Sequence, residues 1–262
     1  MADAMSGTSG APETFGRLEQ PGPRSAYVER MTRETQIRCE VDLDGVGRST
    51  VQTPIGFLTH MLEAFARHAH VDLRIAVAGD LEVDQHHTVE DTGLVLGEAL
   101  RKALGDRRGI WRTASVEFPM DETRAACAVD LSGRPFLVFE ANFQRDFIGQ
   151  LASDLIVEFF AALTNSLAAN LHLRLACGEN DHHKAEALFK AFARAFELAA
   201  SIHPRAHAEI PSTKGALDSV GQAVAGGGGH ALSAAAAAPA TPPGMVRPSA
   251  GGFSLDDLED AP

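Results

Sequence analysis

The pattern His-His-x-x-Glu occurs twice in this chain of 262 residues, first from His86 to Glu90 and again, ninety-six residues later, from His182 to Glu186. Histidine is scarce in proteins, so two adjacent pairs in one pattern indicate a function rather than coincidence. Each copy opens a segment with apolar residues at helical spacing. A chain with the same motif at the start of two helices is expected to fold as two related halves.

The predicted elements follow the same order in both halves. In the first half, residues 29–110, two strands flank a turn at Asp44-Gly45, and a helix, a strand and the helix of His86 follow. The second half, residues 111–217, repeats this order and ends with the helix of His182. The order predicts an α+β fold of internally duplicated ββαβα units, with helices packed on four-stranded sheets.

The turn at Asp44-Gly45 lies in the segment DLDGV, which resembles the nucleophile motif of haloacid-dehalogenase-type phosphatases. That motif requires a large α/β domain after it. A β-hairpin turn with Asp-Gly at its centre accounts for these residues, so we predict a hairpin here.

Composition restricts the partners and the location. The net charge is -12 and the pI is near 5.3, unlike the basic footprint of nucleic-acid-binding proteins. No apolar run approaches the roughly 20 residues that a membrane helix needs. We therefore expect neither a nucleic-acid partner nor a membrane.

The three cysteines form no CxxC pair, which favours a reducing compartment. The cytoplasm is the expected location, with a plastid or another organelle as the alternative.

Both ends of the chain are predicted to lie outside the folded part. Residues 1–28 are rich in Gly, Pro, Ser and Thr, and residues 218–262 are of low complexity. Such segments bury too little apolar surface to fold. We expect a disordered N-terminal arm, a folded domain over residues 29–217 and a C-terminal tail.

Each motif offers two ligands on one helix face. Positions i and i+4 lie together on a helix, so His86 with Glu90, or His182 with Glu186, can hold one cation. The second histidine of each motif points about a quarter-turn away. It is available to a second metal ion or to a substrate.

The repeat nominates two further ligands. His60 lies on the helix that precedes His86, and Glu158 lies at the matching place before His182. If His60 is a ligand, Glu158 is its counterpart, because a carboxylate can replace an imidazole at such a site. Imidazole and carboxylate ligands together suit Mn, Fe, Co, Ni or Zn, and these residues alone do not choose among the metals.

Four segments carry a resemblance to a known family. HHTVEDTGLVLGEAL, DETRAACAVDLSGRP, GENDHHKAEALFKAFARA and PSTKGAL resemble signatures of the imidazoleglycerol-phosphate dehydratases, in family order within residues 29–217. The resemblance implies a ribosomal protein S5 domain 2-like fold and a hydro-lyase of histidine biosynthesis. It also implies two Mn²⁺ ions per active site, between subunits of a large symmetric homo-oligomer, a 24-mer. The implied metal ligands are His60, His86, His87, Glu90, His182, His183 and Glu186, and the internal repeat adds Glu158 to this set.

The resemblance also implies how the substrate is held. The residues that would bind its phosphate are Arg112, Arg134, Lys190, Ser212 and Lys214. Arginine offers paired donors to such a dianion, and lysine offers a point charge. Glu34 matches a substrate-contacting glutamate of the family and is the first candidate for acid–base work. His68 and Glu186 are weaker candidates for this role.

The implied reaction converts D-erythro-imidazoleglycerol phosphate to imidazole-acetol phosphate. We hypothesise that metal coordination acidifies the ring N–H of the substrate and favours an imidazolate. The metal-bound imidazolate expels the hydroxyl as water through a diazafulvene-like intermediate. Three residues depart from the family pattern, one of them Trp111, which stands next to Arg112 in place of a more usual polar residue. Thr59 stands where an aspartate is frequent, and Glu158 stands where a histidine is frequent.

Two rival functions make different predictions. A metal-dependent hydrolase would release phosphate or an acid instead of a ketone. A scaffold without enzymatic activity would bind metal without turnover and would tolerate Glu34→Gln and Lys214→Ala.

Overall fold

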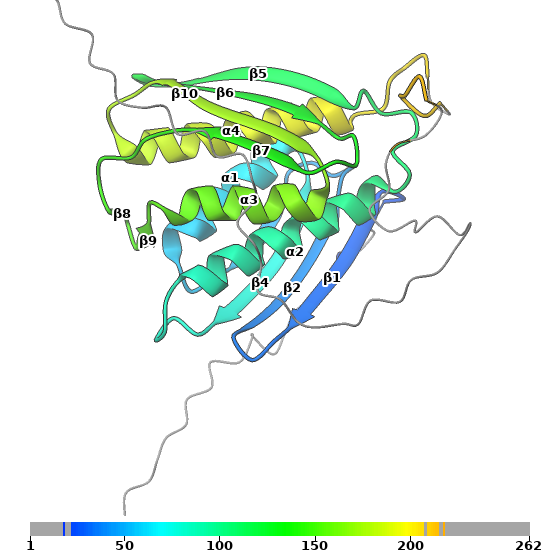
Figure 1. The fold of residues 1–262 in the computed structure, drawn as a ribbon. Coiled ribbons are helices and arrows are strands. Elements are labelled where there is room, and N and C mark those ends of the chain that lie inside the picture. The colour runs from blue at the N-terminus through cyan, green and yellow to red at the C-terminus, as the bar shows by residue number, and fades with distance from the viewer. Residues whose placement is uncertain (1–17, 19–21, 207–208, 215–216, 218–262) are drawn as a thin grey trace, which may run out of the picture. The chain divides into compact units, whose positions relative to one another are not determined.

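The computed structural model describes residues 18, 22–206, 209–214 and 217, which fold as two similar halves (Figure 1). Each half has a four-stranded sheet and two helices. The first half contains β1 (Ser25–Met31), β2 (Thr35–Asp42), β3 (Ser49–Gln52), α1 (Gly56–Ala69), β4 (Asp72–Gly79) and α2 (His86–Leu104). The second half contains β5 (Thr113–Met120), β6 (Thr123–Asp130), β7 (Phe136–Glu140), the short hairpin β8 (Phe147–Ile148) and β9 (Leu151–Ala152), α3 (Leu155–Leu167), β10 (Asn170–Cys177) and α4 (Asp181–Ala200).

The two sheets have the same topology. Their strand orders are β1-β2-β4-β3 and β5-β6-β10-β7. In each sheet the first three strands are antiparallel, and the last strand runs parallel to its neighbour. The predicted duplicated α+β fold with helices on four-stranded sheets is therefore confirmed.

The four-stranded sheet of each half has one strand more than the predicted ββαβα order, and the second half also has the β8–β9 hairpin. In the first half, β1 begins at Ser25, inside the arm that we expected to be disordered over residues 1–28. Its Val28 is buried and pairs with Cys39 of β2. Its first residues, Ser25 and Ala26, continue the small-residue composition of the arm, so composition alone did not separate the strand from it. The predicted tail, residues 218–262, lies outside the described residues.

The hairpin predicted at Asp44-Gly45 is wrong, because β4 lies between β2 and β3. Asp72, the first residue of β4, accepts hydrogen bonds from the backbone N–H groups of Val46 and Arg48, each at 2.9 Å. It also accepts one from the Arg48 guanidinium at 2.6 Å. The connecting loop thus folds around a buried carboxylate, and β3 continues on the far side of β4.

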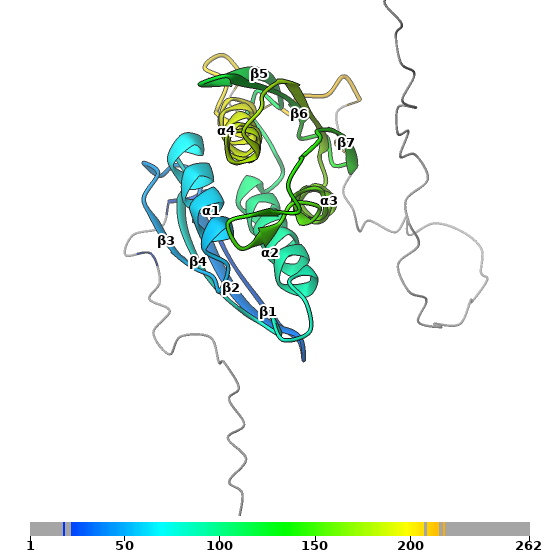
Figure 2. The same cartoon turned by 90° about the vertical axis from the view of Figure 1, so that its left-hand side faces the viewer.

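The four helices lie between the two sheets and pair across the halves (Figure 2). α1 packs against α4, and α2 packs against α3. Phe65 of α1 stacks on Phe192 of α4, with 5.5 Å between the ring centroids. Phe159 and Phe160 of α3 also contact Phe189 of α4. One apolar core therefore joins both halves.

Two glycines allow α2 and α3 to approach closely. A Cβ atom at Gly93 would lie 2.5 Å from the carbonyl oxygen of Phe159, and one at Gly97 would lie 2.5 Å from that of Leu163. No side chain fits at such distances. Both contacts advance in the same direction along the two helices, so the helices run parallel and their N-terminal ends lie together.

Candidate metal centre and active site

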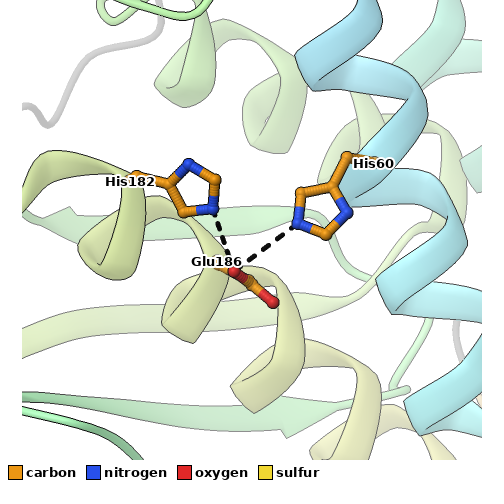
Figure 3. Close-up of side chains that lie close together, drawn as sticks. All are labelled: His60, His182 and Glu186. Carbon is orange, nitrogen blue, oxygen red and sulfur yellow. Dashed lines mark hydrogen bonds and ion pairs between the residues drawn. The ribbon is translucent and has the colours of Figure 1, made fainter.

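Two histidines and one glutamate converge between α1 and α4 (Figure 3). His182 Nε2 lies 3.2 Å from Glu186 Oε2, and His60 Nε2 lies 3.5 Å from the same oxygen. The three ligand atoms lie within 4.8 Å of one another. Two imidazoles and a carboxylate in this arrangement match the donors that borderline divalent ions prefer. The predicted ligands His60, His182 and Glu186 therefore form one candidate metal site.

The local sequence explains why these side chains meet. Asn180 caps α4 by accepting a hydrogen bond from the His182 N–H at 2.9 Å, which fixes the first turn of the helix. Glu186 follows one turn later on the same face. The ring of Phe57 lies edge-on to that of His182, at 5.1 Å between centroids. Stacking of aromatic rings farther along α1 and α4 holds His60 opposite this face.

Glu186 is a buried carboxylate with a cation beside it. Its side chain is 9% exposed, and the Lys190 Nζ lies 2.7 Å from its Oε1. Burial by itself would raise the pKa of Glu186. The hydrogen bond from Lys190 and the nearby His60 and His182 outweigh burial and bring the pKa below its ordinary value. Glu186 is therefore negatively charged at neutral pH, as a metal ligand must be.

The first motif lies at the matching place in the other helix pair. His86 Nε2 lies 3.7 Å from Glu90 Oε2 on α2, and Glu158 lies in the first turn of α3. The N-terminal ends of these two parallel helices lie together. Within the described residues, however, no hydrogen bond or ion pair links Glu158 to either side chain, and the three do not form a cluster as tight as the α1–α4 one.

The second histidine of each motif is turned toward an acidic partner instead. His87 Nδ1 lies 3.2 Å from Asp80 Oδ2, and His183 Nδ1 lies 2.8 Å from Glu122 Oε2. These hydrogen bonds are the largest causes that raise the pKa of each histidine, and the charge of Glu34 adds to the effect at His87. Neither ring joins the α1–α4 cluster.

Sequence reasoning missed Asp80 and Glu122. The sequence contained a signal for both residues, because each acid stands at the end of a strand. Glu122 lies within one of the segments that resemble the family, and Asp80 lies close to another. Asp80 directly follows β4, and Glu122 directly precedes β6.

Four of the five predicted phosphate-binding residues line a single pocket of about 380 Å³. Its lining includes Arg112, Arg134, Ser212 and Lys214. Arg112 is held in place by Asp130, with 2.7 Å between Nε and Oδ1, and by the carbonyl oxygen of Pro211. Lys190 lies elsewhere, because it pairs with Glu186 at the metal cluster.

The two remaining candidates lie on different elements. Glu34 is exposed in the β1–β2 turn, and its carbonyl oxygen accepts a hydrogen bond from the Asp80 N–H at 3.0 Å. His68 lies on α1, edge-on to Phe118 at 5.4 Å between ring centroids. Burial, followed by the charge of Lys190, lowers the pKa of His68, so its ring is neutral at physiological pH.

Comparison with known proteins supports one family. The family model for imidazoleglycerol-phosphate dehydratase matches residues 53–196. The imidazoleglycerol-phosphate dehydratase of Methylorubrum populi is 52% identical over 194 residues, which cover 74% of this chain and 100% of that protein. That of Xanthobacter autotrophicus is 54% identical over 194 residues, covering 74% of this chain and 98% of that protein.

Solved structures agree with this result. The dehydratase from Staphylococcus aureus superposes with a TM-score of 0.61 at 35% identity, covering 68% of this chain and 99% of that chain. The enzyme from Pyrococcus furiosus, solved in complex with (S)-C348, superposes with a TM-score of 0.63 at 34% identity, covering 72% of this chain and 100% of that chain. The duplicated fold, the paired motifs and these similarities lead to one conclusion: this chain belongs to the imidazoleglycerol-phosphate dehydratase family, the lyases that catalyse this dehydration in histidine biosynthesis.

Proposed function

We propose that this chain dehydrates D-erythro-imidazoleglycerol phosphate to imidazole-acetol phosphate with two divalent metal ions per active site, Mn²⁺ being the expected metal. The observation that carries this proposal is the cluster of His60, His182 and Glu186, which fits a divalent ion. The HHxxE motif on α2 and Glu158 on α3 supply the counterpart in the other helix pair. When bound, such ions supply the Lewis acidity that makes the ring N–H of an imidazole easier to remove.

The proposed ligands divide into two sets. His60, His182 and Glu186 hold one ion, and His86, Glu90 and Glu158 hold the other. His87 and His183 point away from these sets, so we assign them to the sites of neighbouring copies. This assignment accounts for a homo-oligomer, which we propose to be a 24-mer by resemblance to the family.

The rest of the chain binds the substrate and moves its protons. The pocket of Arg112, Arg134, Ser212 and Lys214 would hold the phosphate, since it combines cations with a hydroxyl donor. Glu34 is exposed, so its carboxylate is accessible to take up or release a proton at the substrate hydroxyl or C–H. His68 and Glu186 are secondary candidates, and Lys190, beside Glu186, remains a predicted phosphate ligand.

We also propose a cytoplasmic location. The structure pairs none of Cys39, Cys127 and Cys177 in a disulfide, and reducing compartments keep thiols in the free form. None of the helices in the described part of the chain is long and apolar enough to span a membrane.

One assay separates the proposed function from its rivals. The purified chain is stripped of metal, reconstituted with Mn²⁺ and given imidazoleglycerol phosphate, and the enolisable ketone is measured under alkali. Ketone formed only with metal supports the proposal. Inorganic phosphate without ketone would indicate a hydrolase, and bound metal without any product would indicate a scaffold.

A further inference from the structure

Glu34 and Glu122 occupy equivalent places in the repeat but have different surroundings. Each stands directly before the second strand of its half and is followed by a threonine, Thr35 or Thr123. Glu122 holds the second histidine of its half. In the part of the chain that the structure describes, the Glu34 carboxylate forms no hydrogen bond or ion pair, and Asp80 holds His87 in its place.

We propose that Asp80 and Glu122 are positioning residues that fix the rings of His87 and His183. Each accepts the Nδ1–H of its histidine and leaves the Nε2 lone pair for a metal ion. Because Asp80 performs this task in the first half, Glu34 is left free to act on the substrate. The proposal rests on the proposed function, in which both histidines are metal ligands.

The Glu122 carboxylate has a separate task for each oxygen. Oε2 faces His183 Nδ1 at 2.8 Å. Oε1 accepts hydrogen bonds from the backbone N–H groups of Asn180 at 2.9 Å and Glu179 at 3.2 Å, and from the Thr123 hydroxyl at 3.1 Å. Glu122 therefore cannot rotate without releasing the start of α4.

The opposite nitrogen of His183 is less constrained. Asp121 Oδ2 lies 3.7 Å from Nε2, and the Asp121 side chain is 76% exposed. This separation is too long for a hydrogen bond, so Nε2 is available to a metal ion.

The Asp80 carboxylate differs from that of Glu122 in one respect. Its two oxygens lie 3.3 and 3.2 Å from His87 Nδ1, and it accepts no other hydrogen bond among the described residues. The Asp80 backbone is fixed, because its N–H donates to the Glu34 carbonyl and its carbonyl accepts from the Val83 N–H at 2.8 Å. The carboxylate can thus turn about its own axis and still reach His87.

Imidazole chemistry explains why this contact matters. A neutral ring has one N–H donor and one acceptor nitrogen, and a partner on Nδ1 determines which is which. A carboxylate on Nδ1 leaves Nε2 as the acceptor and makes it a stronger ligand.

The difference between the two acids gives a sharp test. In Glu122→Gln, the amide oxygen stays with the backbone N–H groups and the NH₂ group faces His183. Nδ1 must then accept, and Nε2 carries the proton. Mn²⁺ affinity, measured by equilibrium dialysis on the full chain, should fall about 10–100-fold. In Asp80→Asn, the amide oxygen can turn to His87 and keep the tautomer but carries no charge, so affinity should fall less than in Glu122→Gln, whereas Asp80→Ala should weaken it as Glu122→Gln does.

Three controls separate positioning from folding and from the ligand assignment. Metal-free Glu122→Gln should still unfold in a single transition, with a small loss of stability because a neutral oxygen replaces a charged acceptor at the start of α4. Loss of the folded state in this variant would mark a structural role and overturn the proposal. Asp121→Asn removes the same charge from the same turn and should bind Mn²⁺ normally. If His183→Ala loses Mn²⁺ affinity while Glu122→Gln keeps it, positioning is refuted and the ligand set stands. If both keep it, the ligand set of the proposed function also fails.

Discussion

Glu158 and His60 stand at equivalent places in the repeat but differ in charge and in donor atom. The α1–α4 site has two imidazoles and one carboxylate, whereas the proposed α2–α3 site has one imidazole and two carboxylates. Carboxylates favour harder ions such as Mn²⁺ over Ni²⁺ or Zn²⁺. The two proposed sites are therefore chemically unequal within one chain.

We expect Glu158→Ala to lower the number of tightly bound Mn²⁺ ions per chain from two to one, because it removes a ligand from only one site. Glu158→His should keep two sites and shift the α2–α3 site toward Ni²⁺ and Zn²⁺. Metal analysis after equilibrium dialysis measures both effects. Two tightly bound Mn²⁺ ions in Glu158→Ala would exclude Glu158 from the ligands.

Glu34 is the side chain that we expect to move protons. Glu34→Gln keeps the size and hydrogen-bonding capacity of the side chain but cannot take up a proton. Turnover should fall by about 10²–10⁴-fold, the usual contribution of a general acid–base group, and Mn²⁺ content should not change. Steady-state kinetics with metal analysis test this prediction, and an unchanged rate would remove Glu34 from the mechanism.

The connection between β2 and β3 is organised around one buried side chain. Asp72 accepts hydrogen bonds from two backbone N–H groups and from Arg48. Burial alone would raise the pKa of Asp72, but these hydrogen bonds bring it below its ordinary value of 3.8. The stabilisation is therefore complete above that value and is lost as the pH falls through the lower pKa of the folded state.

Asp72→Asn should lower the free energy of unfolding at pH 7 by about 2 kcal/mol, the scale of hydrogen bonds to a charged group. The difference from the original protein should shrink as the pH falls below 3.8. Urea unfolding across this pH range measures the change. A difference that does not vary with pH would show that the charge of Asp72 contributes nothing.

The parallel packing of α2 and α3 depends on the absence of a side chain at Gly93. Gly93→Ala would place a methyl group against the Phe159 carbonyl, and such overpacking costs about 1–3 kcal/mol. It should also separate Glu158 from the motif on α2 and weaken one Mn²⁺ site.

Gly56→Ala is the matched control, because the nearest atom to a Cβ there is 3.8 Å away. Alanine favours a helix over glycine by about 1 kcal/mol, so this variant should be no less stable than the original. Urea unfolding and Mn²⁺ dialysis compare the two variants. Equal stability of Gly93→Ala and Gly56→Ala would refute the importance of close helix approach.

The features of the fold that depend on the local sequence pattern could be predicted from the sequence. Helical spacing placed the helices, and Gly105 ends α2 with a φ of +56°, a backbone conformation that glycine adopts readily. Comparison of the halves nominated Glu158. The hairpin between β2 and β3 failed because an Asp-Gly turn does not reveal which strand will be inserted between its neighbours. Asp80 and Glu122 escaped notice because their partners lie seven and sixty-one positions away, and only tertiary packing brings the second pair together.

At the scale of the whole molecule, His60 belongs to the α1–α4 cluster and His87 does not. This difference leads to a prediction about how neighbouring chains share a site. If His87 of one chain completes a site that contains His60 of a neighbouring chain, His60→Ala and His87→Ala remove two ligands of the same site that come from different chains. The two variants are co-expressed with different tags, and mixed oligomers are isolated by tandem purification. With random mixing, roughly a quarter of the sites in these oligomers receive both histidines.

We expect the mixed oligomers to recover a matching part of the dehydratase activity, while each variant alone stays inactive. The ketone assay compares mixed oligomers with an unassembled mixture of the two proteins. Mixed oligomers no more active than the separate variants would argue that each site is built within one chain.

The exchange of helix partners has an evolutionary consequence. α1 of the first half packs on α4 of the second, and α3 of the second half packs on α2 of the first. A half-length ancestor with this packing would have completed its core only by pairing with a second copy of itself, and its ligands would have met across that boundary. Fusion of two such genes would turn the symmetric pair into one polypeptide and free each position from its twin. His60 and Glu158, or Glu34 and Glu122, could then diverge, which a true homodimer does not permit.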